Sequence, residues 1–365
     1  MNHQQPNPLK VNASWHKYTL DFKFDAGTSR GVLKTKDSYF IKIWSQDDPE
    51  TVGWGEAGPL PKLSPEEGKD LPSLLDTLVK NVSEKEIHRS EECILAFCEE
   101  MVATDCPSVR FALETALLDL HHGGRKLIMD NDFFSGQAKI PINGLIWMGD
   151  AAFMHQQIED KLAQGFTCIK MKIGAINFEE ECRLLAGIRE RFSADEITLR
   201  VDANGAFSPA EAMDKLRRLA AFDLHSIEQP IKAGQYLEMQ RLCASSPLPI
   251  ALDEELIGVT ELQEKAALLD TIKPPFIILK PTLVGGIKAT REWIRLAEAR
   301  QIGWWMTSAL ESNIGLNAIA QLTASYPTDL PQGLGTGQLY HNNIASPLEI
   351  QKGQLVYQPG RQWGD

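Results

Sequence analysis

From about residue 139 onward, short apolar runs alternate with amphipathic helical stretches, and this alternation constrains the fold more than any other feature of the chain. The runs are rich in β-branched residues, as expected of buried strands. Successive strands separated by helices lie parallel, because each helix returns the chain to the edge where the previous strand began. The runs are KIPINGLI, TCIKMKI, ITLRVDA, LHSIEQP, LPIALDE, FIILKPT, IGWWMTS and, less clearly, LPQGLGTG.

About eight apolar strands over roughly 220 residues favour a closed barrel of the (β/α)8 kind. The predicted fold class is therefore α/β, with the barrel in residues 126–339. An open, doubly wound sheet is the alternative. Such a sheet requires a glycine-rich phosphate loop after its first strand, and INGLIWMGD is a poor match to that loop.

The first 125 residues have a different pattern, which predicts a small α+β domain. Residues 14–24 and 38–46 alternate between apolar and polar side chains, as half-buried strands do, and 25–37 reads as the hairpin loop between them. Helices are expected over 65–125, with Ser64 as the first N-cap and a clear helix over 108–122. We expect residues 340–365 to pack back on this domain.

Charged or polar residues occur near the carboxyl end of six successive predicted strands, 25 to 30 residues apart, which is about one βα unit. A single acid after an apolar run is often only a loop residue or a helix cap. Several such residues in register are better explained by convergence on the mouth of a barrel, where enzymes of this fold carry out their chemistry. The six residues are Lys172, Asp202, Glu228, Asp253, Lys280 and Ser308.

Three carboxylates on adjacent strands suit a hard divalent cation, and we expect Mg²⁺, with Mn²⁺ as a possible substitute. Asp253 is followed by Glu254 and Glu255, so spacing alone leaves the third ligand open. A lysine beside a metal and another ammonium has a lowered pKa and can accept a proton. These groups together suit removal of a proton next to a carboxylate, with the metal stabilising the enediolate.

Composition limits the partners of the protein. The formal net charge of −12 argues against nucleic acid or an anionic membrane as the main partner, but allows a small-molecule carboxylate in a site of opposite sign. The six cysteines form no CxxC pair, and no apolar run approaches the length of a membrane span. We therefore expect a cytoplasmic protein, whose oligomeric state, monomer or homo-oligomer, is not determined by the sequence.

Several strand-end motifs resemble those of the enolase superfamily, in its muconate-lactonizing subgroup. They are KMKIG, RVDANGAF, IEQP, ALDEEL, LKPTLVGG and TSALESNIGL. The resemblance covers nearly the whole chain and implies a modified TIM barrel with an N-terminal α+β capping domain that closes the active site. Within the subgroup, LKPTLVGG and GLGTGQLYHNN are most similar to the o-succinylbenzoate synthases, which dehydrate 2-succinyl-6-hydroxy-2,4-cyclohexadiene-1-carboxylate in menaquinone biosynthesis.

The resemblance also implies roles for five residues. Lys172 would be the base that takes the α-proton and then protonates the departing hydroxyl, and Lys280 would stabilise the enediolate from the opposite face. A lysine base with Mg²⁺ is an established pairing in that superfamily. Asp202, Glu228 and Asp253 would bind the metal, the DE motif favouring Asp253 as the third ligand.

Further residues are candidates for substrate binding or for support of the catalytic groups. Alternation places Lys170 on the same face as Lys172, and Arg200 on the same face as Asp202 but deeper in the barrel. An ordinary structural salt bridge is an equally good interpretation of each. The other candidates are Asn204, Glu254, Ser308 and Arg30, the last in a loop that matches the capping loop of the family in position.

The same catalytic groups serve several reactions in this subgroup. The nearest rivals are N-succinylamino acid racemase and dipeptide epimerase, in which both lysines exchange protons. Dipeptide epimerases of the family show a DxD motif near the eighth strand, and GLGTGQLY has no acidic residue. Muconate cycloisomerisation and a barrel without catalysis are the remaining alternatives, the latter disfavoured because all five groups are present.

Overall fold

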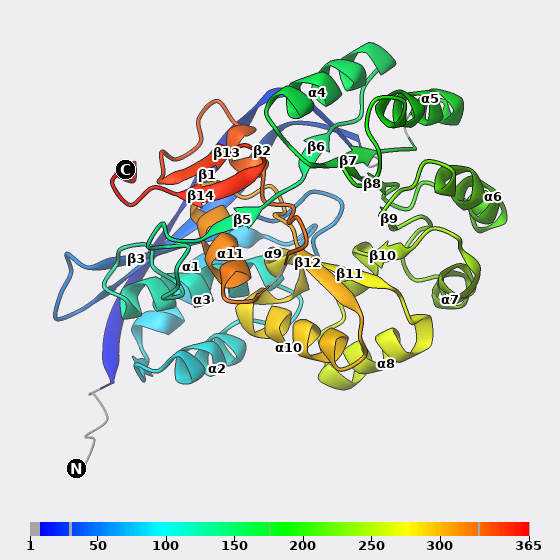
Figure 1. Cartoon of the computed structure of the whole chain (residues 1–365). Helices are drawn as coiled ribbons and strands as arrows, with labels where there is room; N and C mark the ends of the chain where they lie inside the picture. Colours follow the sequence, from blue (N-terminus) through cyan, green and yellow to red (C-terminus); the bar gives the residue numbers. More distant parts are fainter. Residues whose placement is uncertain (1–7, 29–30, 175, 328, 365) are drawn as a thin grey trace.

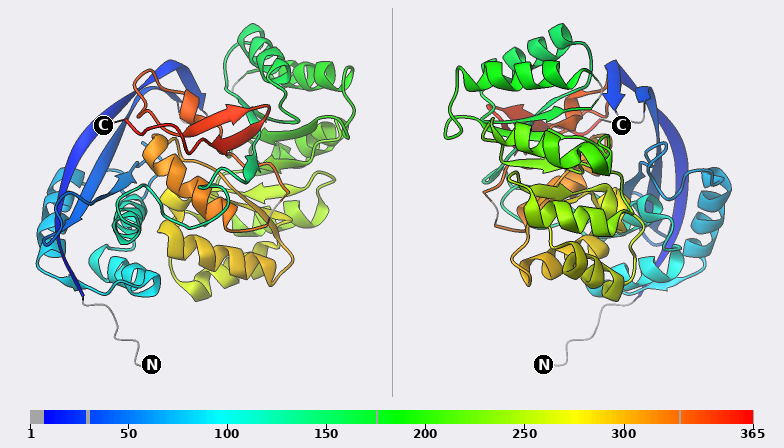
Figure 2. Two further views of the ribbon diagram at one scale, coloured as in Figure 1. Left: turned by 60° about the vertical axis from the view of Figure 1, so that its left-hand side comes forward. Right: turned by 90° about the vertical axis from the view of Figure 1, so that its right-hand side faces the viewer.

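The computed structural model describes residues 8–28, 31–174, 176–327 and 329–364. An N-terminal α+β domain lies beside a parallel barrel, and Figures 1 and 2 show its long strands (blue) to one side of the ring of helices α4–α8. This arrangement confirms the predicted fold class. The predicted domain boundaries after residues 125 and 339 stay a prediction.

The N-terminal domain is built on an antiparallel sheet with strand order β3-β2-β1-β4. Its main hairpin is longer than predicted, because most of residues 25–37 continues the two strands rather than forming a loop. The strands are β1 (Leu9–Thr28), β2 (Gly31–Ser45), β3 (Val52–Ala57) and β4 (Glu86–Ile87), and the helices are α1 (Leu71–Ser83), α2 (Glu91–Met101) and α3 (Pro107–His121).

The first helix begins later than the sequence suggested. Asp70, not Ser64, is the N-cap of α1, and its side chain accepts a hydrogen bond from Ser73 N. Ser64 Oγ instead accepts a hydrogen bond from Leu60 N at 2.8 Å, within a turn. The prediction that Ser64 caps a helix was therefore wrong. A serine followed by a proline occurs both at the start of helices and in turns, so the local sequence does not distinguish the two.

Seven parallel strands in chain order form most of the barrel wall. They are β6 (Gly144–Ile146), β7 (Cys168–Lys172), β8 (Thr198–Asp202), β9 (Ser226–Glu228), β10 (Ile250–Leu252), β11 (Phe276–Leu279) and β12 (Gly303–Met306). The outer helices are α4 (Ala151–Ala163), α5 (Phe178–Arg189), α6 (Pro209–Ala220), α7 (Tyr236–Ser245), α8 (Leu262–Ile272), α9 (Pro281–Val284), α10 (Gly286–Glu298) and α11 (Asn313–Ala324).

The eighth predicted strand is reduced to two isolated parallel bridges, which join Gln332 to Ile142 and Gly333 to Thr307. Backbone hydrogen bonds from Asn143 N to Gln332 O and from Ser308 N to Gly333 O, of 2.9 and 3.0 Å, close the wall there. LPQGLGTG has three glycines and a proline, which disfavour a longer strand.

The first predicted barrel strand is divided between two sheets. Its beginning, β5 (Lys139–Pro141), pairs with the C-terminal hairpin of β13 (Leu348–Gln351) and β14 (Gln354–Tyr357), and only β6 enters the barrel. Just before the hairpin, the chain contacts β1 through the Lys23 N to Leu339 O and His341 N to Asp21 O hydrogen bonds. In the described part of the chain, no helix is long and apolar enough to cross a membrane.

Glu56, at the end of β3, joins the N-terminal domain to the barrel. It is fully buried at the N-terminus of α11, where its carboxylate accepts hydrogen bonds from Ser312 N at 2.8 Å, Gly315 N at 2.9 Å and the Ser312 hydroxyl at 2.5 Å. The Ser38 hydroxyl on β2 also donates to it, at 2.6 Å. A carboxylate is favoured at this position by the unpaired amides and dipole of the helix.

We expect Glu56→Gln to lower the free energy of unfolding by about 1–3 kcal/mol, because an amide loses the charge and places an NH2 group against donors. Urea denaturation monitored by circular dichroism measures this difference. Glu50→Gln is the matched control, since Glu50 is exposed. Equal unfolding midpoints for the two variants would contradict the stabilising role of Glu56.

Candidate active site

The register of the barrel strands places the first three charged residues of the predicted site in one row. Lys172 on β7 lies opposite Asp202 on β8, and Asp202 lies opposite Glu228 on β9. Neighbouring parallel strands in register point opposed side chains to the same face, so the three side chains meet inside the barrel mouth. Asp253 and Lys280 directly follow β10 and β11 and continue the row.

Three lysines and three carboxylates form one buried cluster, in which each residue is at most 9% exposed. Asp202 Oδ2 lies 3.1 Å from both Lys170 Nζ and Lys172 Nζ, and Lys170 also pairs with Glu228. Lys280 pairs with Asp253, and its Nζ lies 3.7 Å from Glu228 Oε1. The charges within the cluster balance, which is how six buried ionisable groups can coexist.

The environment gives the three lysines different proton affinities. Burial lowers the pKa of Lys172, and the ammonium groups of Lys170 and Lys280 lower it further. Burial alone would also lower the pKa of Lys170, but Asp202 and Glu228 raise it above its ordinary value. The pKa of Lys280 is likewise raised, by Asp253 and Glu228 against the effect of burial. Of these three, Lys172 therefore gives up its proton most readily.

The carboxylates are also inequivalent. Burial, followed by repulsion from Asp202 and Asp253, raises the pKa of Glu228 to about 7. Burial also raises the pKa of Asp253. The pKa of Asp202 is held well below its usual range, since the lysines outweigh the effect of burial. Because the raised pKa values of Glu228 and Asp253 mean that their ionised forms are disfavoured, an added positive charge would stabilise the cluster.

Among the described residues, no group of three or more histidine, cysteine, aspartate or glutamate side chains is arranged around a common point as a ready metal site. The lysine ammonium groups occupy the space between the carboxylates instead. The donor set nevertheless fits a divalent cation, because it consists of carboxylate oxygens from adjacent strands. Glu228 Oε1 is also buried and has no hydrogen-bond partner among the residues that the structure describes, which leaves one of these oxygens available as a ligand.

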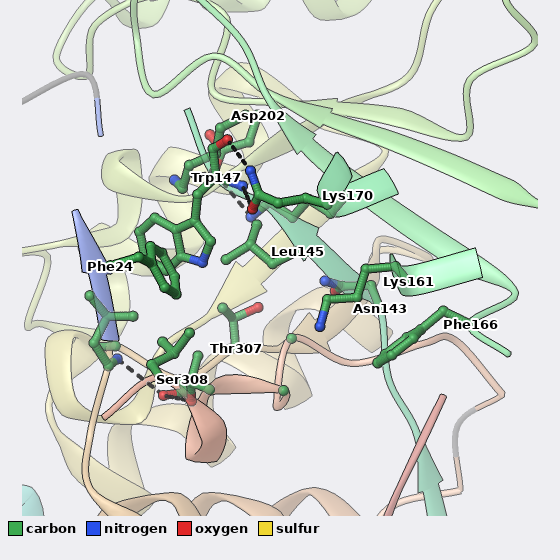
Figure 3. A pocket seen from close by; sticks show the side chains of 18 of the residues that line it. Phe24, Asn143, Leu145, Trp147, Lys161, Phe166, Lys170, Asp202, Thr307 and Ser308 are labelled. Atoms are coloured by element: carbon green, nitrogen blue, oxygen red, sulfur yellow. Dashed lines mark hydrogen bonds and ion pairs between the residues drawn. The ribbon is translucent and has the colours of Figure 1, made fainter. Parts of the chain in front are cut away.

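A cavity of about 340 Å³ opens beside this cluster. Figure 3 shows Lys170 and Asp202 on one side of it, with Lys161, Asn143 and Phe166 on the other. Its lining is otherwise largely apolar and includes Phe24 from β1 and Leu60 from the N-terminal domain, so both domains contribute to the site. The other lining residues are Leu145, Trp147, Phe153, Gln157, Asp160, Gln164, Lys172, Asn204, Lys280, Thr307, Ser308, Ala309, Leu310, Gly333, Gly335, Thr336 and Leu339.

Asn204 and Glu254, two of the candidate supporting residues, lie beside the cluster. Asn204 Oδ1 accepts a hydrogen bond from Lys172 Nζ at 2.8 Å, and Asn204 Nδ2 donates to Glu254 Oε1 at 3.0 Å. The backbone of Asn204 has φ +43°, which turns the chain sharply after Asp202. These contacts fix the position of the Lys172 amine.

Arg200 lies deeper in the barrel, as alternation predicted, but its contacts are structural. Its guanidinium stacks on the Trp305 ring at 4.1 Å and donates to Pro331 O at 2.7 Å. It is 2% exposed and does not line the cavity. Arg200 therefore packs the closed end of the barrel.

Ser308 lines the cavity, but its hydroxyl forms hydrogen bonds with neighbouring residues of the cavity wall. It donates to Glu311 Oε2 at 2.5 Å, and it accepts from Thr336 Oγ1 at 2.8 Å and Leu310 N at 3.1 Å. Arg30 lies outside the described residues. Its neighbour Lys34 is exposed and lies 3.9 Å from Asp25 Oδ1, away from the cavity lining.

Gln229 is a supporting residue that the sequence reasoning missed. It is fully buried, and its Oε1 accepts hydrogen bonds from Asp253 N at 3.1 Å and Glu255 N at 3.4 Å. Its Nε2 donates to Glu255 Oε2 at 2.8 Å. The glutamine of IEQP thus sets where the chain turns after β10 and directs Glu255 away from the cluster.

Comparison with known proteins agrees with this geometry. Residues 154–361 match the enolase C-terminal domain-like family. The chain is 50% identical to an o-succinylbenzoate synthase of Desulfotalea psychrophila, over 94% of this chain and 98% of that protein. The crystal structure of MenC from Desulfotalea psychrophila covers 95% of this chain and 99% of that chain at 47% identity, with a TM-score of 0.82.

More distant relatives have other activities. The L-Ala-D/L-Glu epimerase of Bacillus subtilis is 24% identical over 82% of this chain and 80% of that protein. Its substrate-liganded structure has a TM-score of 0.82 at 20% identity and covers 96% of each chain. Identity at this level shows a common fold only.

Proposed function

The chain belongs to the enolase superfamily, among the o-succinylbenzoate synthases, and we propose that it dehydrates 2-succinyl-6-hydroxy-2,4-cyclohexadiene-1-carboxylate to o-succinylbenzoate. The observation that carries this proposal is the 50% identity to a synthase over nearly the whole chain. The buried lysines at the cavity support it, because they provide both a base and a cation for an enediolate.

Lys172 is the proposed proton carrier. Its neutral amine takes the proton from the ring carbon that bears the carboxylate, and the electrons of that C–H bond move into the carboxylate as an enediolate. The electrons then return to form a ring double bond while the C–O bond to the hydroxyl breaks. The Lys172 ammonium gives its proton to the departing oxygen, which leaves as water, so the lysine ends the cycle neutral.

Lys280 is the proposed electrostatic partner. Asp253 and Glu228 raise its pKa against the effect of burial, which favours the ammonium form. In the proposed reaction this ammonium stabilises the negative charge of the enediolate without exchanging protons. Lys170 stays protonated for the same reason and lowers the proton affinity of Lys172. In the proposed dehydration only Lys172 exchanges a proton, whereas in an epimerase of the superfamily both lysines would do so.

Asp202, Glu228 and Asp253 are the proposed ligands of Mg²⁺, which Mn²⁺ could replace. When bound, the ion supplies Lewis-acid stabilisation of the carboxylate oxygens as charge develops on them. We further propose a cytoplasmic location, in keeping with six cysteines that are all free in the described structure.

The purified protein with Mg²⁺ should convert the cyclohexadiene acid to o-succinylbenzoate, detectable by the absorbance change on aromatisation. A parallel incubation of N-succinylamino acids and L-Ala-L-Glu in D₂O, followed by NMR, tests the rival activities. Rapid deuterium exchange with inversion, without turnover of the cyclohexadiene acid, would replace the dehydratase with a racemase or epimerase. The absence of acidic residues from 333–340 argues against recognition of a dipeptide ammonium group there.

A further inference from the structure

One wall of the cavity, away from the cluster, carries polar side chains that the proposed reaction does not use. Lys161 comes from α4, Asn143 precedes β6 and Thr307 follows β12. Figure 3 shows Lys161 extending into the pocket beside Asn143. Gln157, Ser308 and Thr336 also line the cavity, but their side chains already hydrogen-bond within the protein. Lys161, Asn143 and Thr307 are therefore the groups best able to bind a charged part of a ligand there.

Lys161 reaches the cavity because β6 leaves space for its stem. A Cβ atom at Gly144 would lie 3.0 Å from Lys161 Cγ and 3.1 Å from its Cβ and Cδ, closer than ordinary packing allows. The ammonium group lies 5.0 Å from the centre of the Phe166 ring and 3.5 Å from Gln164 Oε1. A side chain at position 144 would displace this lysine.

No ion pair within 4.0 Å joins Lys161 to a carboxylate in the described part of the chain. Asp160, the nearest acid in sequence, also lines the cavity and accepts a hydrogen bond from Gln156 Nε2 at 2.8 Å. Burial lowers the pKa of Lys161, and Asp160 only partly offsets this effect. The lysine is thus a partly desolvated cation that would gain from an anionic partner.

Asn143 and Thr307 have unsatisfied polar atoms at this wall. Asn143 is 4% exposed, and its Oδ1 has no hydrogen-bond partner among the described residues; the same is true of Thr307 Oγ1. Buried polar atoms are nearly always paired, so unpaired ones at a cavity indicate a missing ligand or solvent group. An amide can turn to present its NH2 group, and a hydroxyl can donate, so both can bind an anion.

These two residues flank the short closure of the barrel. Gly333 bridges to Thr307, and a Cβ atom at Gly333 would lie 2.4 Å from Thr307 Oγ1. Gln332 O accepts the hydrogen bond from Asn143 N. The reduced eighth strand therefore leaves both side chains facing the cavity rather than covered by a longer strand.

We propose that Lys161, Asn143 and Thr307 bind the second carboxylate of the substrate, at the end of its succinyl chain. This inference rests on the proposed function, in which the ring carboxylate is held at the lysine cluster. A dianionic substrate in a largely apolar cavity needs a separate cation for its other charge, and Lys161 is the cation that lines the cavity outside the cluster. The ammonium, amide and hydroxyl groups together match the acceptors of one carboxylate.

The test compares Lys161→Met and Lys161→Arg with the exposed control Lys85→Met. For Lys161→Met, we expect KM for the cyclohexadiene acid to rise about 10- to 100-fold with a much smaller change in kcat. The reason is that the variant loses a charge-assisted hydrogen bond to the substrate. Lys161→Arg should recover part of the affinity. Thr307→Val, which keeps the shape of the side chain, should raise KM by a smaller factor.

Calorimetric binding of two ligands separates a binding role from a structural one. o-Butyrylbenzoate has a methyl group where o-succinylbenzoate has its second carboxylate. The wild-type protein should prefer o-succinylbenzoate, and Lys161→Met should lose most of that preference while binding o-butyrylbenzoate as before. An unchanged preference and an unchanged KM would overturn the assignment of Lys161 and leave the proposed function intact. If the wild-type protein did not turn over the cyclohexadiene acid at all, the proposed function itself would fail.

Discussion

Lys172→Met should lose kcat by about 10²–10⁴-fold or more while the protein keeps its fold, because the substitution removes the amine that takes the α-proton in the proposed mechanism. Lys172 is 8% exposed, and of the three cluster lysines it is the one whose pKa is lowered. Its amine is held by Asn204 Oδ1 and Asp202 Oδ2, at 2.8 and 3.1 Å, with the cavity beside it. Methionine keeps the length of the side chain and removes only the amine. Steady-state kinetics measures the loss, and circular dichroism checks the fold.

Lys352→Met is the matched control for this variant, since Lys352 is exposed and lies outside the cavity lining. It should retain wild-type kcat. A Lys172→Met protein with more than about a tenth of wild-type turnover would exclude Lys172 as the base, given the usual size of this contribution. Removal of a buried cation also changes the charge balance of the cluster and could destabilise the protein. The inactive variant should therefore have the same unfolding midpoint as the wild-type protein.

Removal of divalent metal by EDTA should abolish turnover, and Mg²⁺ or Mn²⁺ should restore it. The expectation follows from three buried carboxylates, of which Glu228 has a pKa raised to about 7. One oxygen of Glu228 also has no hydrogen-bond partner in the described part of the chain. Added Mg²⁺ should also raise the melting temperature of the metal-free protein, since an ion that binds only the folded state stabilises it. This second measurement is independent of the substrate.

EDTA that has been saturated with Mg²⁺ beforehand is the control for effects of the chelator itself. Full activity after exhaustive chelation would contradict the metal assignment. For Glu228→Gln, the increase in melting temperature with Mg²⁺ should be smaller than for the wild-type protein, because one anionic ligand is lost. An equal increase in both proteins would place the ion elsewhere.

The barrel and the positions of its charged residues were predictable because they depend on local periodicity. Strand periodicity fixes which residues share a face, and the βα repeat fixes where each strand ends. Lys172, Asp202 and Glu228 could therefore be assigned to one level before their register was known, and the register agrees with that assignment. Their catalytic and metal-binding roles stay predictions.

Other features depend on contacts distant in sequence and could not be read from local patterns. The local sequence of residues 139–141 predicts a strand but not the sheet to which it belongs. Its pairing with the C-terminal hairpin places it outside the barrel. Similarly, the hydrogen bonds of Gln229 to Asp253 and Glu255 require knowledge of how β9 and β10 lie together. Lys161 looks like an ordinary surface lysine of a helix until Gly144 is seen beside its stem.

The buried Glu56 restricts how substrate can enter. A hinge rotation of the entire N-terminal domain away from the barrel would have to break its three hydrogen bonds to the start of α11 at once. The contacts of Phe24 with Trp147 and Phe153, at ring distances of 5.8 and 6.3 Å, involve no charge and can separate at smaller cost. Substrate entry is therefore expected to depend on local separation of Phe24 from Trp147 and Phe153 while the two domains stay in contact. The rate of entry and the stability of the domain contact can then change independently in evolution.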